Sequence, residues 1–106
     1  MPQIIVRNER EKERAWEFDV ILKDAGQRLE YHVSLSWSDY DLWCHGRTAP
    51  EMVVQAAFRF LLDREPARAI LRQFDCAVMR RYFPEVDREL PRYLGQTDAA
   101  GQEPSA

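Results

Sequence analysis

The chain has 106 residues, of which 45% are hydrophobic and 31% are charged, so it can bury one core but not two. Its formal net charge of −3 argues against the broad positive field on which non-specific nucleic-acid binding depends. No apolar run reaches the roughly 20 residues that cross a bilayer, and the start, Met1-Pro2-Gln3, lacks a signal peptide's apolar segment. These features predict a single cytoplasmic domain that does not enter a membrane.

The first fourteen residues predict an edge strand followed by a connector. Ile4, Ile5 and Val6 are apolar enough for a short edge strand. Residues 7–14 (RNEREKER) alternate in charge without an apolar period, which is typical of a solvated connector. We therefore expect residues 1–14 to be loosely ordered or to form an edge strand, and a third strand over residues 3–7 stays open.

A β-hairpin is the clearest element in the sequence. Apolar and polar residues alternate over residues 16–23 and again over residues 29–37, and Asp24-Ala25-Gly26-Gln27 supplies a turn between them. If Asp24 faces Gln27, Leu22 faces Leu29 and the apolar residues of both strands share one face. Because a hairpin alone is marginal in water, we expect helices or another strand to cover that face.

A long apolar helix follows the hairpin. Thr48-Ala49-Pro50-Glu51 has the pattern of a capped start, with Thr48 as the cap, and the helix should extend to about Asp63. Its few polar residues recur at every fourth position, so the helix is expected to be enclosed on several sides. The segment before it, residues 38–45, is compatible with either a helical turn or a loop, with Gly46 as its terminator.

The rest of the chain predicts further helices and a tail. Residues 66–74 show an inner apolar face that predicts a second helix, and Asp75 can cap a third segment over residues 76–82. Val86, Leu90 and Leu94 mark a last helix that Pro91 disturbs. From Gly95 onward no apolar period remains, so residues 95–106 predict a disordered tail.

These elements predict an α+β fold of two layers. An N-terminal antiparallel hairpin, of two or three strands, packs against three to four C-terminal helices within residues 1–94.

Several core and helix-boundary residues form a familiar pattern. They are His32-Val33-Ser34-Leu35-Ser36, Tyr40, Ala49-Pro50-Glu51, residues 57–66 (AFRFLLDREP), Ile70-Leu71, Phe74-Asp75 and Tyr82-Phe83-Pro84-Glu85. Over residues 17–90 the chain resembles a set of small uncharacterised bacterial proteins of unknown function. The resemblance implies one compact intracellular domain, and it carries no activity, cofactor or catalytic residue.

Two cysteines are too few for a disulfide scaffold, so we expect both thiols to be reduced. Cys44 and His45 are adjacent, and an imidazole can activate a thiol, but neighbours in a chain seldom face each other, so we interpret them as an ordinary loop pair. Cys44, His45, Cys76 and His32 contain no CxxC or HxxxH spacing. We therefore predict no metal site and no cofactor.

Asp19 and His32 become neighbours across the predicted hairpin. A carboxylate beside an imidazole is an acid–base pair, and an enzyme that uses both residues is one hypothesis for the function. Surface charge pairing explains the same two residues equally well, and we favour a protein that is not an enzyme.

Nucleic-acid binding is the second hypothesis. Residues 66–74 and 75–82 would form a helix-turn-helix, in which Arg72, Arg80 and Arg81 contact phosphates. The acidic net charge and the lack of a glycine in the turn argue against it.

Aromatic residues near the end of the hairpin support protein binding, which is the preferred hypothesis. Trp37, Tyr40 and Trp43 lie close in sequence to His45 and Arg47, and large side chains with polar tips are enriched at protein interfaces. The alternative is that these aromatics close the end of the core. We predict a small non-enzymatic binding or adaptor module whose partner is another protein or a second copy of the chain.

Overall fold

The computed structural model describes the backbone of residues 2–102 and the side chains of residues 2–94. Four strands form one sheet in the order β1-β2-β3-β4, with β1 to β3 antiparallel and β4 parallel to β3. They are β1 (Gln3–Lys12), β2 (Ala15–Asp24), β3 (Gln27–Ser36) and β4 (Gln73–Asp75). The α+β class is confirmed, but the sheet has more strands than the sequence predicts.

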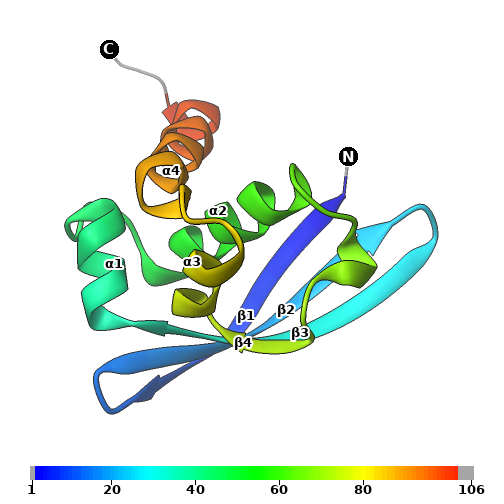
Figure 1. Ribbon diagram of the computed structural model, residues 1–106, viewed down its shortest axis with the longest axis horizontal. Coiled ribbons are helices and arrows are strands. Elements are labelled where there is room, and N and C mark those ends of the chain that lie inside the picture. Colours follow the sequence, from blue (N-terminus) through cyan, green and yellow to red (C-terminus); the bar gives the residue numbers. More distant parts are fainter. Residues whose placement is uncertain (1, 103–106) are drawn as a thin grey trace.

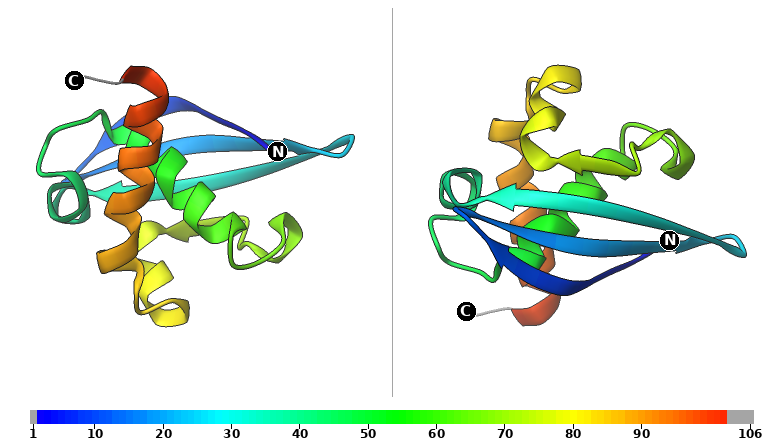
Figure 2. Two further views of the ribbon diagram at one scale, coloured as in Figure 1. Left: turned by 90° about the horizontal axis from the view of Figure 1, so that it is seen from above. Right: turned by 90° about the horizontal axis from the view of Figure 1, so that it is seen from below.

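The helices cover one face of this sheet and leave the other face open (Figures 1 and 2). They are α1 (Trp37–Cys44), α2 (Pro50–Leu62), α3 (Met79–Tyr82) and α4 (Val86–Gln102), with single 3-10 turns η1 (Ala67–Ala69) and η2 (Cys76–Val78). Within the described part of the chain, no helix is both long enough and apolar enough to span a membrane.

The predicted hairpin and its register are confirmed. Asp24 pairs with Gln27, and Leu22 pairs with Leu29. Between Asp24 and Gln27, Ala25 and Gly26 both adopt positive φ values, of 52° and 81°. A two-residue turn with both central φ angles positive matches the twist of the flanking strands, which fixes this register.

Strand β1 is longer than the sequence predicts. It extends through residues 7–12, which we expected to form a connector, and Arg7 and residues 10–12 pair with β2. The register shifts between Arg7 and Arg10, where Asn8 has a φ of 59°, so a bulge interrupts the ladder. The prediction was wrong because the β2 edge supplies backbone partners that charge alternation does not reveal, and charged side chains suit an exposed edge strand.

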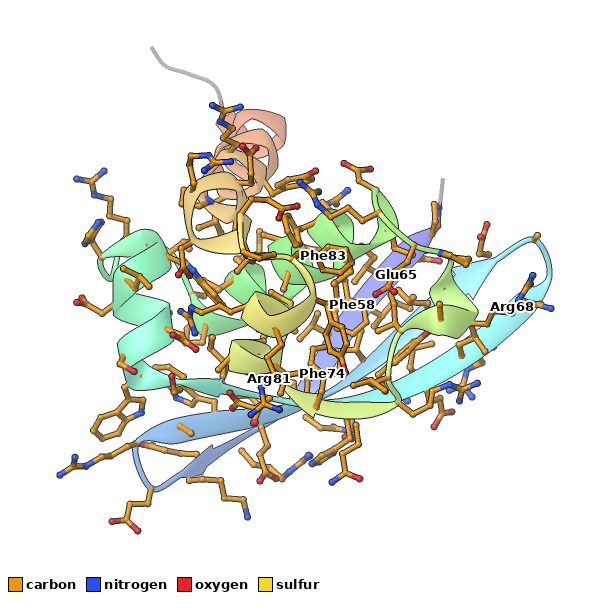
Figure 3. The ribbon with its side chains drawn as sticks, viewed as in Figure 1. Phe58, Glu65, Arg68, Phe74, Arg81 and Phe83 are labelled. Carbon is orange, nitrogen blue, oxygen red and sulfur yellow. The ribbon has the colours of Figure 1, made fainter. Side chains whose placement is uncertain are left out.

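The core lies between the inner face of the sheet and α2. Phe58 of α2 is fully buried and packs edge to face on Tyr31 of β3, with ring centroids 5.2 Å apart. Phe58 also contacts Phe74 of β4, at 6.0 Å (Figure 3). The predicted enclosure of this helix is therefore confirmed. Its cap is not Thr48, because the helix begins one residue later, after Ala49, and the Thr48 carbonyl accepts a hydrogen bond from the Tyr40 hydroxyl.

The helix predicted over residues 66–74 does not form. After Pro66 the chain makes only the turn η1 and then extends as β4 along the edge of β3. The His32 amide donates to the Arg72 carbonyl at 2.7 Å, and the Ser34 hydroxyl donates to Asp75 at 2.6 Å. The first bond satisfies a backbone amide at the edge of β3, and the second joins side chains of the two strands. Local helix propensity does not outweigh this pairing.

The C-terminal elements agree better with the predictions made from the sequence. Asp75 accepts a hydrogen bond from the Ala77 amide at 2.9 Å, as a cap should, and Met79 is buried. Helix α4 contains Pro91 and continues to Gln102, beyond the point at which the sequence predicts the disordered tail to begin. Residues 103–106 of that predicted tail lie outside the described residues.

The hairpin turn yields a stability prediction. Ala25→Asn should raise the free energy of unfolding by roughly 0.5 kcal/mol, because asparagine tolerates positive φ better than alanine. Gly26→Ala should lower it by about 1 kcal/mol. Space around Gly26 is open, so that loss would come from the backbone alone. Urea denaturation measures both, and equal stability of the two variants would contradict this account of the turn.

Candidate functional site

A charged cluster occupies the open face of the sheet. Asp19 and His32 are paired across β2 and β3, as the sequence predicts, and the His32 Nδ1 lies 3.2 Å from Asp19 Oδ1. The other ring nitrogen, Nε2, lies 3.3 Å from Glu17 Oε1. From β1, Asn8 donates to Asp19 at 2.8 Å and Arg10 donates to it at 3.2 Å. All five side chains belong to one network.

This cluster is poorly suited to acid–base catalysis. The hydrogen bond from Asn8, together with those from Arg10 and His32, lowers the pKa of Asp19 to about 2. A general acid or base works best with a pKa near the ambient pH, and a base also needs a free nitrogen. Here a carboxylate faces each nitrogen of His32. A surface depression of about 290 Å³ does border both Asp19 and His32, but the pair is already engaged within the sheet.

The aromatic segment after β3 divides between core and surface. Trp43 is only 2% exposed, and its indole Nε1 donates to Asp87 of α4 at 2.8 Å. Tyr40 is half-buried and packs edge to face on Trp16 at 5.1 Å. Trp37 is 44% exposed. Trp43, which we expected to contact a partner, therefore belongs to the core of the protein.

The other residues of that segment, His45 and Arg47, lie at the surface. His45 ends α1 in the left-handed conformation, with a φ of 54°, so segment 38–45 is a helix and not a loop. Cys44 is buried with its Sγ 4.0 Å from the Thr48 carbonyl, while the His45 residue beside it is exposed.

The remaining thiol is also shielded. Cys76 is buried at the start of η2, and this burial raises the pKa of its thiol. Among the described residues, no three His, Cys, Asp or Glu side chains gather in a way that could hold a metal ion.

The three arginines of the nucleic-acid hypothesis have different surroundings. Arg80 binds two carboxylates, with 2.6 Å to Asp39 and 2.8 Å to Asp87. Arg72 lies just before β4, with its guanidinium 5.6 Å from the centre of the Tyr31 ring. Arg81 is exposed on α3. Because residues 66–74 form a turn and a strand, the expected pair of helices that would present these arginines does not exist.

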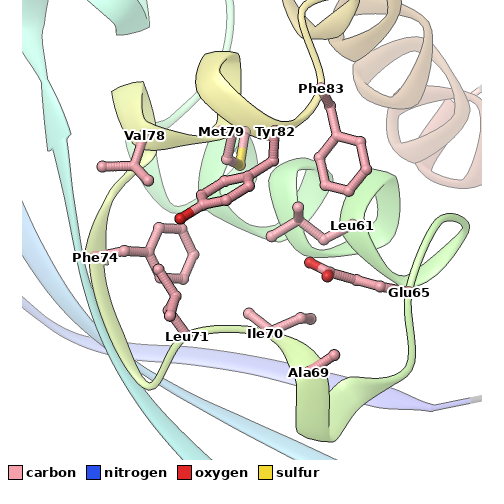
Figure 4. A pocket seen from close by; sticks show the side chains of 10 residues that line it. All are labelled: Leu61, Glu65, Ala69, Ile70, Leu71, Phe74, Val78, Met79, Tyr82 and Phe83. Carbon is pink, nitrogen blue, oxygen red and sulfur yellow. The ribbon is translucent and has the colours of Figure 1, made fainter.

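The structure also contains a groove that the sequence did not reveal. It lies between the segment that leads into β4 and helix α3, and the end of α2 forms its floor (Figure 4). Its volume is about 150 Å³. Its lining side chains are apolar except for the Glu65 carboxylate and the Tyr82 hydroxyl. They are Leu61, Glu65, Ala69, Ile70, Leu71, Phe74, Val78, Met79, Tyr82 and Phe83. We call this cavity the apolar groove.

Two large side chains border the apolar groove while remaining exposed to solvent. Leu71 is 49% exposed and Tyr82 is 64% exposed. The sequence held one signal for this arrangement, the adjacent apolar pair Ile70-Leu71. In an extended segment successive side chains point to opposite sides, so one of the two must leave the core. The signal was lost because we predicted a helix there.

Comparisons of the chain with protein-family models, curated proteins and solved structures find no match. The resemblance to small bacterial proteins therefore stays a prediction.

Arg80 and Arg81 offer a matched test of these assignments. Arg80→Ala should destabilise the protein by about 2 kcal/mol, because it leaves Asp39 without its charged partner. Asp39 is 6% exposed. Arg81→Ala should change stability by less than about 0.5 kcal/mol. Thermal unfolding followed by circular dichroism compares the two. Equal midpoints would show that the Arg80 ion pairs contribute nothing to folding.

The charged cluster predicts a specific pH dependence. The pKa of Asp19 is lower in the folded chain than in the unfolded chain, so its stabilising effect is present above about pH 4 and is lost as the pH falls toward 2. Because Asp19 is partly exposed, we expect Asp19→Asn to cost no more than about 1 kcal/mol at pH 7. Urea denaturation at pH values from 7 to 2 measures the difference from the wild type. A difference that stays constant over this range would contradict the assignment.

Proposed function

We propose that the protein is a non-enzymatic binding module that receives a short apolar segment of a partner protein in the apolar groove. The observation that carries this proposal is the exposure of Leu71 and Tyr82 at the border of a preformed cavity. Large apolar side chains grouped around a concave site are a common feature of interaction surfaces. Such a module would act as an adaptor, in the sense that it holds a partner without changing it chemically.

The size of the groove supports a single anchoring side chain. A cavity of about 150 Å³ is comparable to an engineered protein cavity that binds benzene. One aromatic or branched aliphatic side chain of a partner would therefore fill it. Interfaces commonly concentrate their binding energy in a few such buried anchors.

The other hypotheses have weaker support. Nucleic-acid binding through Arg72, Arg80 and Arg81 loses Arg80, whose guanidinium already pairs with Asp39 and Asp87. An enzyme that uses Asp19 and His32 would need groups that are free to exchange protons, and these two bind each other and their neighbours. The surface around Trp37 stays a second candidate for protein binding because that indole is half exposed.

Selection of displayed random peptides against the full chain tests the proposal. The enriched peptides should bind the Leu71→Ser and Tyr82→Ser variants roughly tenfold more weakly, since each variant removes apolar area that the complex would bury. Trp37→Ser is the matched control, because it removes an exposed side chain of α1 that does not line the groove, and it should leave binding unchanged.

Two results would contradict the proposal. Peptides that lose binding only with Trp37→Ser would identify the surface around Trp37 as the contact site. A concentration-dependent dimer that Leu71→Ser dissociates would identify a second copy of the chain, and not another protein, as the occupant of the groove.

A further inference from the structure

We propose that Glu65 makes the apolar groove selective for a basic partner segment, in which a lysine or arginine pairs with the Glu65 carboxylate while a neighbouring apolar side chain fills the cavity. This inference rests on the proposed function and adds the chemistry of the partner to it.

The carboxylate of Glu65 points into the groove between Leu61 and Ile70 (Figure 4). Among the described residues, its side chain has no hydrogen-bond or ion-pair partner. The two positively charged neighbours in sequence do not supply one. Arg64 donates to Glu85 at 2.9 Å, with its guanidinium stacked 3.8 Å above the Phe60 ring, and Arg68 is exposed.

Other partly buried carboxylates of this protein are compensated. Asp39 binds Arg80, Glu85 binds Arg64, and Asp75 accepts from Ser34 and from a backbone amide. Glu65 differs from these groups because the apolar surroundings raise its pKa without an opposing charge. An uncompensated carboxylate in an apolar site is unfavourable for folding, so folding does not explain why it is there.

A cationic ligand would supply the missing charge. A charge-assisted hydrogen bond is stronger than one between neutral groups, and a bound partner would itself displace water from the carboxylate. The rings of Phe74, Tyr82 and Phe83 line the same cavity, and aromatic faces attract ammonium and guanidinium groups as well as apolar side chains. The charge and the walls of the groove therefore favour the same kind of partner, which joins a cation to an apolar body.

Three small probes of one shape test this inference on the full-length protein by NMR titration. They are 2-phenylethylammonium, 2-phenylethanol and phenylacetate, which carry a positive charge, no charge and a negative charge. We expect the ammonium compound to bind roughly tenfold more tightly than the alcohol, with shifts of the Glu65, Leu71 and Tyr82 amides. Phenylacetate should bind most weakly.

Glu65→Gln should remove the preference for the ammonium compound and leave the affinity for the alcohol unchanged. Glu51→Gln, at the opposite end of α2, is the control and should leave both affinities as they are. The Glu65→Gln variant should fold normally. Because the pKa of Glu65 is raised in the folded chain, its ionised form opposes folding at neutral pH, and the thermal midpoint at pH 7 should stay equal or rise.

The outcomes distinguish the two proposals. If the alcohol binds in the groove as tightly as the ammonium compound, or phenylacetate binds most tightly, the charge preference is overturned while the binding of apolar groups stands. If none of the three compounds shifts the groove amides, both this inference and the groove as a binding site are overturned.

Discussion

The pairing of β4 with the edge of β3 determines where the second half of the chain lies. The paired segment is short, but interactions at three successive residues of β3 stabilise it. The His32 amide bonds to the Arg72 carbonyl, Phe74 lies opposite Val33 and packs on Phe58, and Ser34 donates to Asp75. An unpaired inner edge of β3 would leave backbone groups without partners, so closing this edge takes precedence over local helix propensity.

The apolar groove is a consequence of that pairing. Because the chain leads into β4 and does not form a helix here, Ile70 and Phe74 are buried while Leu71 stays exposed. The chain then turns through η2 into α3, which brings Tyr82 to the other side of the gap. A helix over residues 66–74 would have buried one continuous apolar face and left no such cavity. The candidate binding site and the sheet edge thus have the same physical origin.

The charged residues divide according to whether the fold supplies them with a partner. On the open face of the sheet, Asp19 and His32 have several partners each. This is typical of a solvated surface whose charged side chains stabilise the fold. Arg80 connects α1 to α4 through Asp39 and Asp87, so it is a structural residue although its sequence position suggests a phosphate contact. Glu65 is the contrasting case, since it faces an apolar cavity without compensation. This difference between Glu65 and the other partly buried carboxylates depends on the environment of each side chain in the folded chain.

The sequence by itself determined the elements whose signals are local. A period close to two and a two-residue turn indicated the β2–β3 register, including the contact between Asp19 and His32, and the apolar circumference of α2 indicated its enclosure. Only the tertiary structure decided the extension of β1, the strand β4, the burial of Trp43 and the apolar groove. Each of these depends on partners distant in sequence: the β2 edge for residues 7–12, Asp87 for Trp43, and the β3 edge for Phe74. The periodicity of a sequence shows which neighbouring side chains share a face of a helix or strand. Which strand edge needs a partner, and which charge lacks one, depends on segments that meet only in the folded chain.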